Sequence, residues 1–568
     1  MNETVIPIKS VGTSKQRKRQ APRGRIVDQT ALEQVRALVG SGPLRHDLLI
    51  EYLHLINDRY QQLGAPHLAA LARLMGLAQT EVYEVATFYH HFDVVKESRD
   101  GAVAAPAELT VRVCDGLSCE MAGAAALLER LPEILGRQVR VIPAPCVGRC
   151  EQAPVAIVHQ KPVPGATVDS VKDAVQADQR FDTPTGYIDF DRYVSQGGYK
   201  VLRDCLEHRR DVESVIKTLE DSGLRGLGGA GFPAGRKWRI VRGEPAPRLL
   251  AVNIDEGEPG TFKDRVYLER DPHRFLEGML ISAWAVGIAG IYIYLRDEYH
   301  GCRAILEAEL DKLRANPPVP MPRIELRRGA GAYICGEESA MIESIEGKRG
   351  MPRLRPPYVA QVGLFGRPTL EHNFETLYWV RELLEKGAAA FASQGRNDRK
   401  GLRSFSVSGR VREPGVKLAP AGITIRQLID EFCGGMQEGH TFYGYLPGGA
   451  SGGILPASMG NIPLDFDTLQ PYGCFIGSAA VIVLSDKDTA KAAARNMMRF
   501  FEHESCGQCT PCRVGTAKAS VLIEGEQWDK AALADLSQVM RDASICGLGQ
   551  AAPNPVDCVI KYFPNELT

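Results

Sequence analysis

The sequence predicts a multidomain protein of mixed α/β and α+β class. Its 568 residues exceed what one hydrophobic core accommodates. Apolar residues recur with helical spacing near both ends of the chain, whereas short apolar runs typical of strands alternate with helical segments in the middle. Acidic and basic residues nearly cancel, 69 against 68, so the overall charge gives no reason to expect a nucleic-acid partner.

The N-terminal segment and the longest apolar run indicate where in the cell the protein is expected. The longest apolar stretch, FLEGMLISAWAVGIAGIYIYL, contains Glu277 and several glycines, which favours a buried helix running into a strand over membrane insertion. Residues 1–26 carry a basic cluster without the apolar core of a secretion signal, and we expect a disordered tail there. Fourteen cysteines then predict metal or redox chemistry in the cytoplasm, where structural disulfides are disfavoured.

Residues 27–95 have helical periodicity and predict a small helical bundle, with Gly64 and Pro66 separating two of its helices. His90 and His91 close this segment and raise the hypothesis of a metal site. Because adjacent residues on a helix do not share a face, packing or surface roles are favoured for them.

Residues 96–180 contain the strand-like runs LTVRVCDG, RQVRVIPAPC and VAIVHQ, with cysteines in the loops. Cys114 and Cys119 are separated by four residues, and Cys146 and Cys150 by three. Four thiolates suit a [2Fe–2S] cluster or tetrahedral zinc. Neither pair has the C-x-x-C spacing usual for zinc, so the cluster is preferred and zinc stays as an alternative. Residues 181–200, loose and rich in proline and glycine, predict a linker.

The segment 201–375 predicts an α/β domain in which LLAVNID, GIYIYL and RIELRRG are strands. Before the first strand stands the glycine-rich phrase GLRGLGGAGFPAGRKW. Gly226, Gly228 and Gly231 match G-x-G-x-x-G, but the preceding DVESVIKTLEDSG predicts a helix with a glycine stop, which argues against a Rossmann turn. A tight surface connection is the plain alternative.

Such a loop can nevertheless bind a phosphate, because glycines let several backbone N–H groups converge on a ligand. Lys237 adds a positive charge nearby. Asp255, Glu256 and Glu258 follow the strand LLAVNID, at the end where open α/β sheets place their ligands.

The last third contains a strand-rich unit at 376–485, with the phrase LPGGASGGILP, and a helical unit at 486–568. In the helical unit, Cys506, Cys509 and Cys512 form C-x-x-C-x-x-C, and Cys546 can supply a fourth thiolate. This is the bacterial ferredoxin spacing and predicts a [4Fe–4S] cluster, with zinc as the lesser alternative.

The phrases GLRGLGGAGFPAGRKW, NIDEGEPGTFKDR and GAGAYICGEESAMIESIEGKRGMPRLRPPY resemble the flavin and NADH binding (51-kDa-type) subunit of respiratory complex I. Relatives of that subunit occur in NAD-reducing hydrogenases and NAD-dependent formate dehydrogenases. The resemblance covers roughly residues 200 to 565, and the spacing of the first four cysteines resembles the thioredoxin-like, 24-kDa-type subunit. It implies a fusion of the two: a thioredoxin-like [2Fe–2S] domain, a Rossmann-like FMN and NAD domain, a ubiquitin-like (SLBB-type) domain and a helical [4Fe–4S] bundle.

The resemblance also implies the cofactor-binding residues. The residues expected to hold FMN are Gly226, Gly228, Gly229, Lys237, Asn253, Asp255, Gly336, Glu337 and Asn373. Those expected to bind NAD are Phe232, Glu258, Tyr333, Glu338, Arg355 and Tyr358, and Glu256 and Thr376 complete the candidate set. Leu227 and Arg355 depart from the arginine and lysine expected in complex I, which puts phosphate and NAD contacts there in doubt. Cys335 is expected near the flavin, without a role.

The implied activity is hydride exchange between NAD and FMN, followed by one-electron transfer through the Cys506 cluster to a partner. The [2Fe–2S] cluster is expected to act as a side reservoir. We expect the partner to be a catalytic α subunit with a molybdenum or tungsten pterin cofactor and further iron–sulfur clusters that oxidises formate, since LPGGASGGILP and GLGQAAPNPV resemble that group. A hydrogenase module and complex I are the alternatives. A non-catalytic scaffold without flavin is disfavoured by the intact segment from Gly226 to Lys237.

Overall fold

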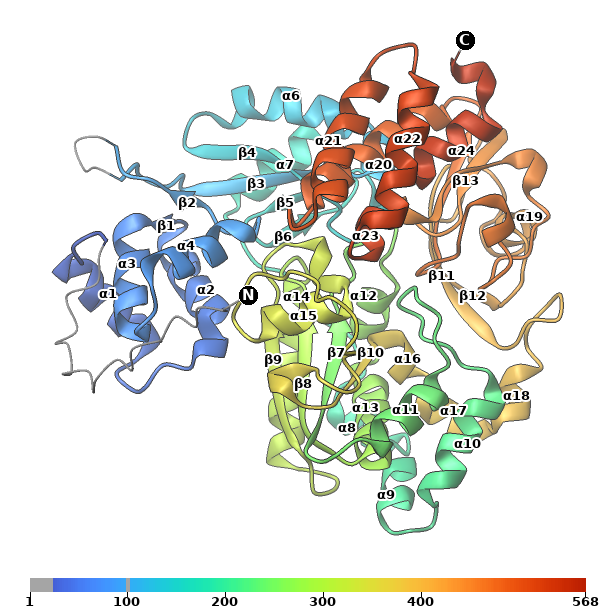
Figure 1. Ribbon diagram of the computed structural model, residues 1–568, viewed down its shortest axis with the longest axis horizontal. Coiled ribbons are helices and arrows are strands. Elements are labelled where there is room, and N and C mark those ends of the chain that lie inside the picture. Colours follow the sequence, from blue (N-terminus) through green and yellow to red (C-terminus); the bar gives the residue numbers. More distant parts are fainter. Residues whose placement is uncertain (1–23, 99–102, 568) are drawn as a thin grey trace, which may run out of the picture.

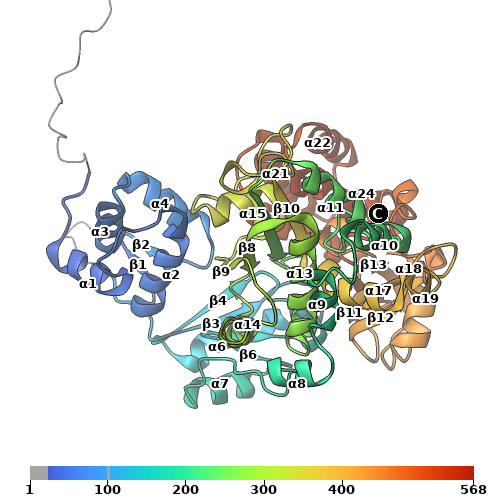
Figure 2. The same ribbon diagram turned by 90° about the horizontal axis from the view of Figure 1, so that it is seen from below.

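The computed structural model describes residues 24–98 and 103–567. Most of the predicted tail at 1–26 therefore lies outside the described residues. The described chain forms a large body with a small helical lobe at one edge (Figures 1 and 2). Within it, no helix is both long and apolar enough to cross a membrane.

The lobe is the predicted helical bundle, and its four helices are α1 (Gln29–Val39), α2 (Leu49–Tyr60), α3 (Ala65–Met75) and α4 (Gln79–Phe88). Asp28 caps α1 by accepting from the N–H of Ala31, and Gly76 ends α3 in the left-handed conformation. Two short parallel strands, β1 (Leu63–Gly64) and β2 (Val94–Val95), tie the bundle together.

A four-stranded sheet of order β4-β3-β5-β6 follows. Its strands are β3 (Leu109–Cys114), β4 (Val139–Ala144), β5 (Ala156–Val158) and β6 (Lys161–Val163). Only the β3–β4 pair is parallel. The helices of this unit are α5 (Leu117–Met121), α6 (Ala124–Leu135) and α7 (Val168–Gln176). Val111 and Val113 alternate into its core from β3.

The central domain is a parallel sheet of order β10-β7-β8-β9 with helices around it (Figure 1). Its strands are β7 (Arg248–Ile254), β8 (Ile288–Leu295), β9 (Arg323–Arg328) and β10 (Thr369–Asn373). The three predicted strands are confirmed, and the longest apolar stretch is the helix α13 (Pro272–Val286) running into β8. The other helices are α9 (Lys200–Leu206), α10 (Val212–Ser222), α11 (Ala234–Gly243), α12 (Lys263–Leu268), α14 (His300–Ala315) and α15 (Glu338–Ile345).

Two flanking segments belong to this core. The segment 181–200, expected to be a linker, contains α8 (Phe190–Ser195), and Tyr193 and Tyr199 are buried in the core of the central domain. Three short helices after β10 pack there too: α16 (Phe374–Tyr378), α17 (Val380–Lys386) and α18 (Ala388–Ala392). We therefore place the end of the central domain after α18 instead of at residue 375.

The strand-rich unit is a five-stranded mixed sheet of order β12-β11-β15-β13-β14. Its strands are β11 (Leu402–Gly409), β12 (Gly415–Pro420), β13 (Phe442–Leu446), β14 (Leu455–Pro456) and β15 (Ala480–Ser485). β11 and β15 pair in parallel at the centre, and α19 (Ile425–Gln427) begins the crossing helical segment. This parallel central pair with one crossing helix suits the predicted ubiquitin-like domain.

The C-terminal unit is helical and contains α20 (Ala490–Glu504), α21 (Thr510–Glu524), α22 (Lys530–Ala543), α23 (Gly547–Ala551) and α24 (Asn554–Tyr562). Thr489 caps α20 by accepting from the N–H of Ala492. The helices α20, α21, α22 and α24 pack on one another beside the five-stranded sheet (Figure 1).

Candidate functional site

The glycine-rich loop is a closed hairpin between two helices. It leaves α10 at Gly223 and enters α11 at Ala234. Its neck is closed by hydrogen bonds from Gly226 N to Phe232 O (2.8 Å) and from Ala234 N to Leu224 O (3.0 Å). The helix expected before the glycines is confirmed, so this is not the strand–loop–helix of a Rossmann turn.

The loop lies against the carboxyl end of β10. Leu227 N donates to the hydroxyl of Thr376 at 2.9 Å. A Cβ at Gly228 would lie 2.9 Å from the Cβ of Asn373, so only glycine fits this approach without displacing a neighbour. Asn373 pairs with Asn253 across the parallel strands β10 and β7. Two predicted amides therefore stand side by side beneath the loop, at the strand ends where open sheets bind ligands.

Asp255 supplies the strongest sign of a ligand at this strand end. Asn253 Nδ2 donates to Gly336 O at 2.9 Å, and its Oδ1 accepts from Asp255 N at 3.0 Å. Within the described chain, Asp255 Oδ2 is buried and has no hydrogen-bond partner. Burial raises the pKa of Asp255 well above its usual range. Because native proteins rarely leave a buried oxygen unsatisfied, a bound polar molecule fits here, and the polar edge of a flavin is suitable.

Lys237 extends from α11 towards the same edge of the sheet. Its Nζ donates to the backbone oxygen of Glu371 at 2.9 Å and lies 3.1 Å from the Glu371 carboxylate. The burial of nearby Glu338 and the charge of Glu371 raise the pKa of Glu338, while Lys237 opposes this shift. The amine thus carries a positive charge to the predicted phosphate region.

Charged side chains cluster at the start of α15. Glu337 caps α15, with one carboxylate oxygen 2.9 Å from each of Ser339 N and Ala340 N. Arg355 contacts Glu337 and lies 2.9 Å from a Glu338 oxygen. Two other predicted NAD contacts are exposed aromatics, Phe232 at 38% and Tyr358 at 56%. Exposed rings can stack on the planar groups of a dinucleotide.

Glu258 is held by a segment that sequence reasoning did not assign to the site. Its carboxylate accepts from Ser451 N (2.8 Å) and Ser451 Oγ (2.6 Å), and from the hydroxyl of Tyr333. Ser451 lies in the short 3-10 helix Ala450–Gly452, within the phrase LPGGASGGILP. Gly449 precedes it at a φ of 73°, and a Cβ there would lie 2.6 Å from Glu258 Cγ. Burial raises the pKa of Glu258.

Glu256 is placed differently from the expectation. Its carboxylate accepts from Asp264 N (2.9 Å), Arg265 N (3.2 Å) and the Tyr299 hydroxyl (2.9 Å), and so caps α12. The structure therefore gives Glu256 a supporting position behind the strand end. We correct our expectation that its side chain faces the ligand.

The four cysteines of the thioredoxin-like unit converge. All four are buried, and Cys146 Sγ lies 3.3 Å from Cys150 Sγ. Cys114 shares hydrogen bonds with Cys119 and Cys146, which raise the pKa of Cys114 well above its usual range. Four converging soft ligands fit a [2Fe–2S] cluster, whose iron would replace the shared protons.

Arg296 joins this cysteine group to the strand end. Its guanidinium donates to Cys146 O (2.8 Å) and to Glu256 O (2.6 Å). Cys146 also receives a backbone hydrogen bond from Gly260, in the loop that carries Glu258. The loop between Asp255 and Gly260 thus separates the first cysteine group from the predicted flavin pocket.

The second cysteine group lines one cavity, formed by Ile334, Pro352, Ser505, Cys506, Gln508, Cys509, Cys512, Ile545, Cys546 and Leu548. Cys509 and Cys546 each stand immediately before a helix, α21 and α23. Burial raises the pKa of Cys512 to about 11 and that of Cys546 to about 12. Without a cation these thiols stay protonated, so the four residues fit a cluster whose iron supplies the positive charge.

The 3-10 helix Tyr333–Gly336 separates this cavity from the strand end. Ile334 lines the cavity, whereas Gly336 receives the hydrogen bond from Asn253. Between them, Cys335 is fully buried, and burial raises its pKa. The two cysteine groups therefore lie on different sides of Asp255.

Three family models match the chain. They are a thioredoxin-like [2Fe–2S] ferredoxin over residues 35–179, a Nuo51 FMN-binding domain over 219–382 and an NADH-ubiquinone oxidoreductase-F iron–sulfur binding region over 492–568. An NADH-quinone oxidoreductase subunit of Rhizobium meliloti (strain 1021) is 39% identical over 402 residues, which are 68% of this chain and 95% of the relative. The chain belongs to the family of the complex I 51-kDa subunit.

Other members extend the likeness. The mitochondrial NADH dehydrogenase [ubiquinone] flavoprotein 1 of Dictyostelium discoideum is 38% identical over 395 residues, 66% of this chain and 82% of that protein. The crystal structure of an NAD⁺-reducing [NiFe]-hydrogenase in the H₂-reduced state superposes with a TM-score of 0.81 at 33% identity, covering 92% of this chain and 93% of that one. The chain is thus an NADH-binding diaphorase subunit of the complex I and NAD-reducing hydrogenase type, with the expected fusion and FMN, [2Fe–2S] and [4Fe–4S] domains.

Two details set this family member apart from our expectation of complex I. Leu227 is buried, and its backbone binds Thr376 instead of presenting a cation. Arg355 pairs its charge with Glu337 and Glu338. Lys237 is thus the nearest cation to the loop among the predicted cofactor-binding residues.

Proposed function

We propose that this chain exchanges hydride between NAD(H) and FMN at the carboxyl ends of β7 and β10, and that its partner oxidises formate. The observation that carries the first part is the unsatisfied oxygen of Asp255 beneath the glycine-rich loop. FMN supplies the conversion between a two-electron hydride and the single electrons that iron–sulfur clusters carry. The protein's own contribution is to bind, orient and exclude water.

Each predicted residue then has a task. Gly228 lets the loop approach Asn373, and Asp255 accepts a hydrogen bond from the bound flavin. Phe232 and Tyr358, both exposed, stack on the planar rings of NAD. These residues would hold the two cofactors in place, and orientation provides much of the acceleration in a transfer between bound groups.

Glu258 contributes a fixed carboxylate to the NAD side. Its oxygens are held by Ser451 and Tyr333, so the group is preorganised. A carboxylate suits the ribose hydroxyls or the carboxamide of NAD, because it accepts hydrogen bonds from both.

The two cysteine groups have different tasks in this proposal. The cavity lined by Cys506 lies across the short helix Tyr333–Gly336 from the flavin region, and its cluster passes electrons to the partner. The Cys146 group lies behind the loop that ends at Gly260 and acts as the side reservoir. Both groups border the region of Asp255, as a branched path requires.

The formate partner rests on the phrases LPGGASGGILP and GLGQAAPNPV. The first phrase contributes Ser451 and Gly449 to the pocket around Glu258. A hydrogenase module is the second candidate, favoured by the hydrogenase structure that covers 92% of this chain.

Metal and activity analysis of the native complex distinguishes the candidates. Molybdenum or tungsten with formate-driven NAD⁺ reduction supports the first, and nickel with hydrogen-driven reduction replaces it by the second. Purified chain that lacks FMN would contradict both and favour a scaffold.

A further inference from the structure

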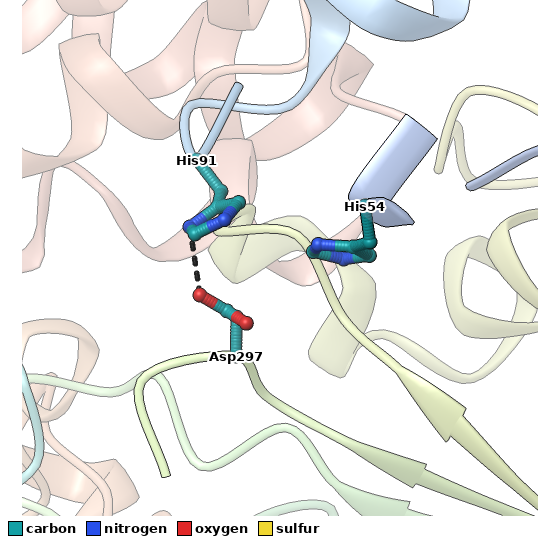
Figure 3. A group of neighbouring side chains, drawn as sticks. All are labelled: His54, His91 and Asp297. Carbon is teal, nitrogen blue, oxygen red and sulfur yellow. Dashed lines mark ion pairs between the residues drawn. The ribbon is translucent and has the colours of Figure 1, made fainter. Parts of the chain in front are cut away.

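A group of potential metal ligands that contains no cysteine lies where the helical bundle meets the central domain. His54 on α2 and His91 after α4 come from the bundle, and Asp297 follows β8 of the central domain. Figure 3 shows the two imidazoles and the carboxylate facing one another. Their ligand atoms all lie within 4.8 Å of one another.

The turn that carries His91 corrects an expectation from the sequence. α4 ends at Phe88, and Tyr89 leaves the helical conformation with a φ of −99° and a ψ of 123°. His90 and His91 therefore follow the helix, and their N–H groups donate to Gly331 O (3.1 Å) and Ala330 O (3.0 Å). This pins the turn to the central domain. The argument that residues on one helix cannot share a face thus does not apply to His91.

His54 presents a free lone pair. Its Nε2 lies 2.9 Å from Gly329 O, and since a carbonyl oxygen only accepts, Nε2 carries the proton. Nδ1 is then an acceptor, and within the described chain it is buried without a partner. The residue is 2% exposed, and burial lowers the pKa of His54 well below its usual range, which keeps the ring neutral. A buried, neutral, unpartnered imidazole nitrogen is the state in which histidine binds a metal.

The second and third ligands are already paired. His91 Nδ1 lies 2.7 Å from Asp297 Oδ2. The other Asp297 oxygen accepts from Arg328 Nε at 2.5 Å, and Arg328 also pairs with Asp58 at 2.5 Å. Asp297 and Asp58 thus share the Arg328 guanidinium. Asn57, beside His91, contributes another buried oxygen without a partner in the described chain.

We propose that His54, His91 and Asp297 bind one divalent cation of the zinc type and thereby fasten the helical bundle to the flavin domain. Two imidazoles and one carboxylate are a normal zinc ligand set, with water as the fourth ligand. The Arg328 guanidinium donates to Asp297 Oδ1, and hydrogen bonds of this kind commonly orient metal ligands. The cation takes the place of the proton between His91 Nδ1 and Asp297 Oδ2, and that proton leaves to solvent or moves to His91 Nε2.

The geometry requires a small contraction. Ligands at zinc–nitrogen distances of about 2.0–2.1 Å stand roughly 3.3 Å apart in a tetrahedron. The 2.7 Å contact between His91 Nδ1 and Asp297 Oδ2 must open by about 0.6 Å, and the other ligand separations, all within 4.8 Å, must close by up to about 1.5 Å. His91, whose side chain is 11% exposed, is the most accessible of the three ligands.

The test uses the full-length chain with its flavin and clusters in place. Protein is treated with a chelator, desalted, incubated with zinc sulfate and desalted again, and zinc per chain is measured by mass spectrometry. X-ray absorption at the zinc edge reports whether the neighbours are nitrogen and oxygen or sulfur. We expect one zinc per chain with an imidazole-containing shell and no sulfur, and a zinc-dependent rise in Tm.

The variants are His54→Gln, His91→Gln and Asp297→Asn, with His67→Gln and His90→Gln as controls. His67 lies on α3 of the same bundle and stacks on Tyr60, whereas His90 neighbours His91 but contacts His503. Zinc retention should fall at least about tenfold in the three site variants and stay unchanged in both controls.

Three results would overturn the proposal: wild-type protein that retains no zinc, a sulfur-dominated zinc shell, or retention that depends on His90 and not on His91. Bound FMN and the EPR signals of the clusters show whether each variant is folded. If a site variant does not fold, the absorption spectrum and zinc-dependent Tm of the wild type still decide the matter.

Discussion

Substitution of Gly228 by alanine tests how the glycine-rich loop makes room for its ligand. The new Cβ would lie 2.9 Å from Asn373 Cβ and 3.4 Å from its Cγ. Asn373 is not free to retreat, because its Oδ1 accepts from Glu375 N at 3.0 Å and its Nδ2 donates to Asp264 Oδ2 at 2.8 Å. The loop or the amide must therefore shift, and both belong to the predicted flavin site.

The expected size of the effect follows from the contact. Inserting one methyl into a packed region costs about 1–3 kcal/mol. If the strain is relieved by displacing the loop from its bound position, FMN affinity falls by about 5- to 150-fold. NADH-driven reduction of an artificial acceptor should fall in parallel and recover when excess FMN is added.

The assay is equilibrium dialysis of FMN with protein stripped of flavin. Gly243→Ala is the matched control, because it lies at the end of α11 where a Cβ meets nothing within 4 Å. Gly226→Ala separates two causes: its Cβ meets no protein atom closer than 3.6 Å, so a loss there measures the approach of FMN itself. Gly228→Ala protein that binds FMN as tightly as Gly243→Ala protein would refute the reasoning.

Three further predictions concern NAD, the cluster path and pH. Phe232→Ala should raise the KM for NADH by about 2- to 10-fold, and Glu258→Gln should also raise it. Both variants should retain FMN. Loss of FMN from Phe232→Ala protein would instead assign that ring to the flavin site. Cys509→Ser should leave flavin bleaching by NADH intact but abolish the [4Fe–4S] EPR signal and partner reduction, and undiminished partner reduction would contradict the relay. Burial raises the pKa of Glu51 from 4.5 to about 7, although the positive charge of Arg327 opposes this shift. Between these two pH values the folded chain keeps a proton on Glu51 that the unfolded chain has lost. The free energy of unfolding should therefore fall as pH rises through this range. Glu51→Gln should flatten this part of the Tm–pH curve, and an unchanged slope would contradict the assignment.

Local patterns predicted much of this fold. The strands β7 and β8 contain short apolar runs, and in β9 Ile324 and Leu326 alternate with charged residues. The helix before Gly223 has an amphipathic face and a glycine stop. The cysteine spacings predicted both groups of thiols, because ligands close in sequence must be close in space. Period and spacing are local quantities, and one sequence is enough to read them.

Other features depend on partners distant in sequence. The burial of Tyr193 and of α16 to α18 in the central core could not be read from their own short segments. Ser451 meets Glu258 across 193 positions, and Arg296 meets Cys146 across 150. The local sequence pattern around these residues does not predict which distant residue each one contacts.

The case of Asp255 and Glu256 shows where a correct position gave a wrong side chain. Both follow β7, at the strand end where a ligand was expected. Both lie beyond Ile254, the last residue of β7, where the chain has left the strand. Asp255 keeps the unsatisfied oxygen, and Glu256 turns behind the strand to cap α12. Which of the two carboxylates turns away is decided by the N–H groups at the start of α12, not by alternation along the strand.

A buried guanidinium helps to hold the first cysteine group against the central domain. In this chain Arg296, 5% exposed, donates to the backbone beside Cys146 and to the backbone beside Asp255. Removing it would leave two buried carbonyl oxygens without a donor, at a cost of about 1–3 kcal/mol each. Arg296 therefore contributes a buried contact between the [2Fe–2S] domain and the strand end, beside the contacts that Arg265 makes with Gly148 and Glu151.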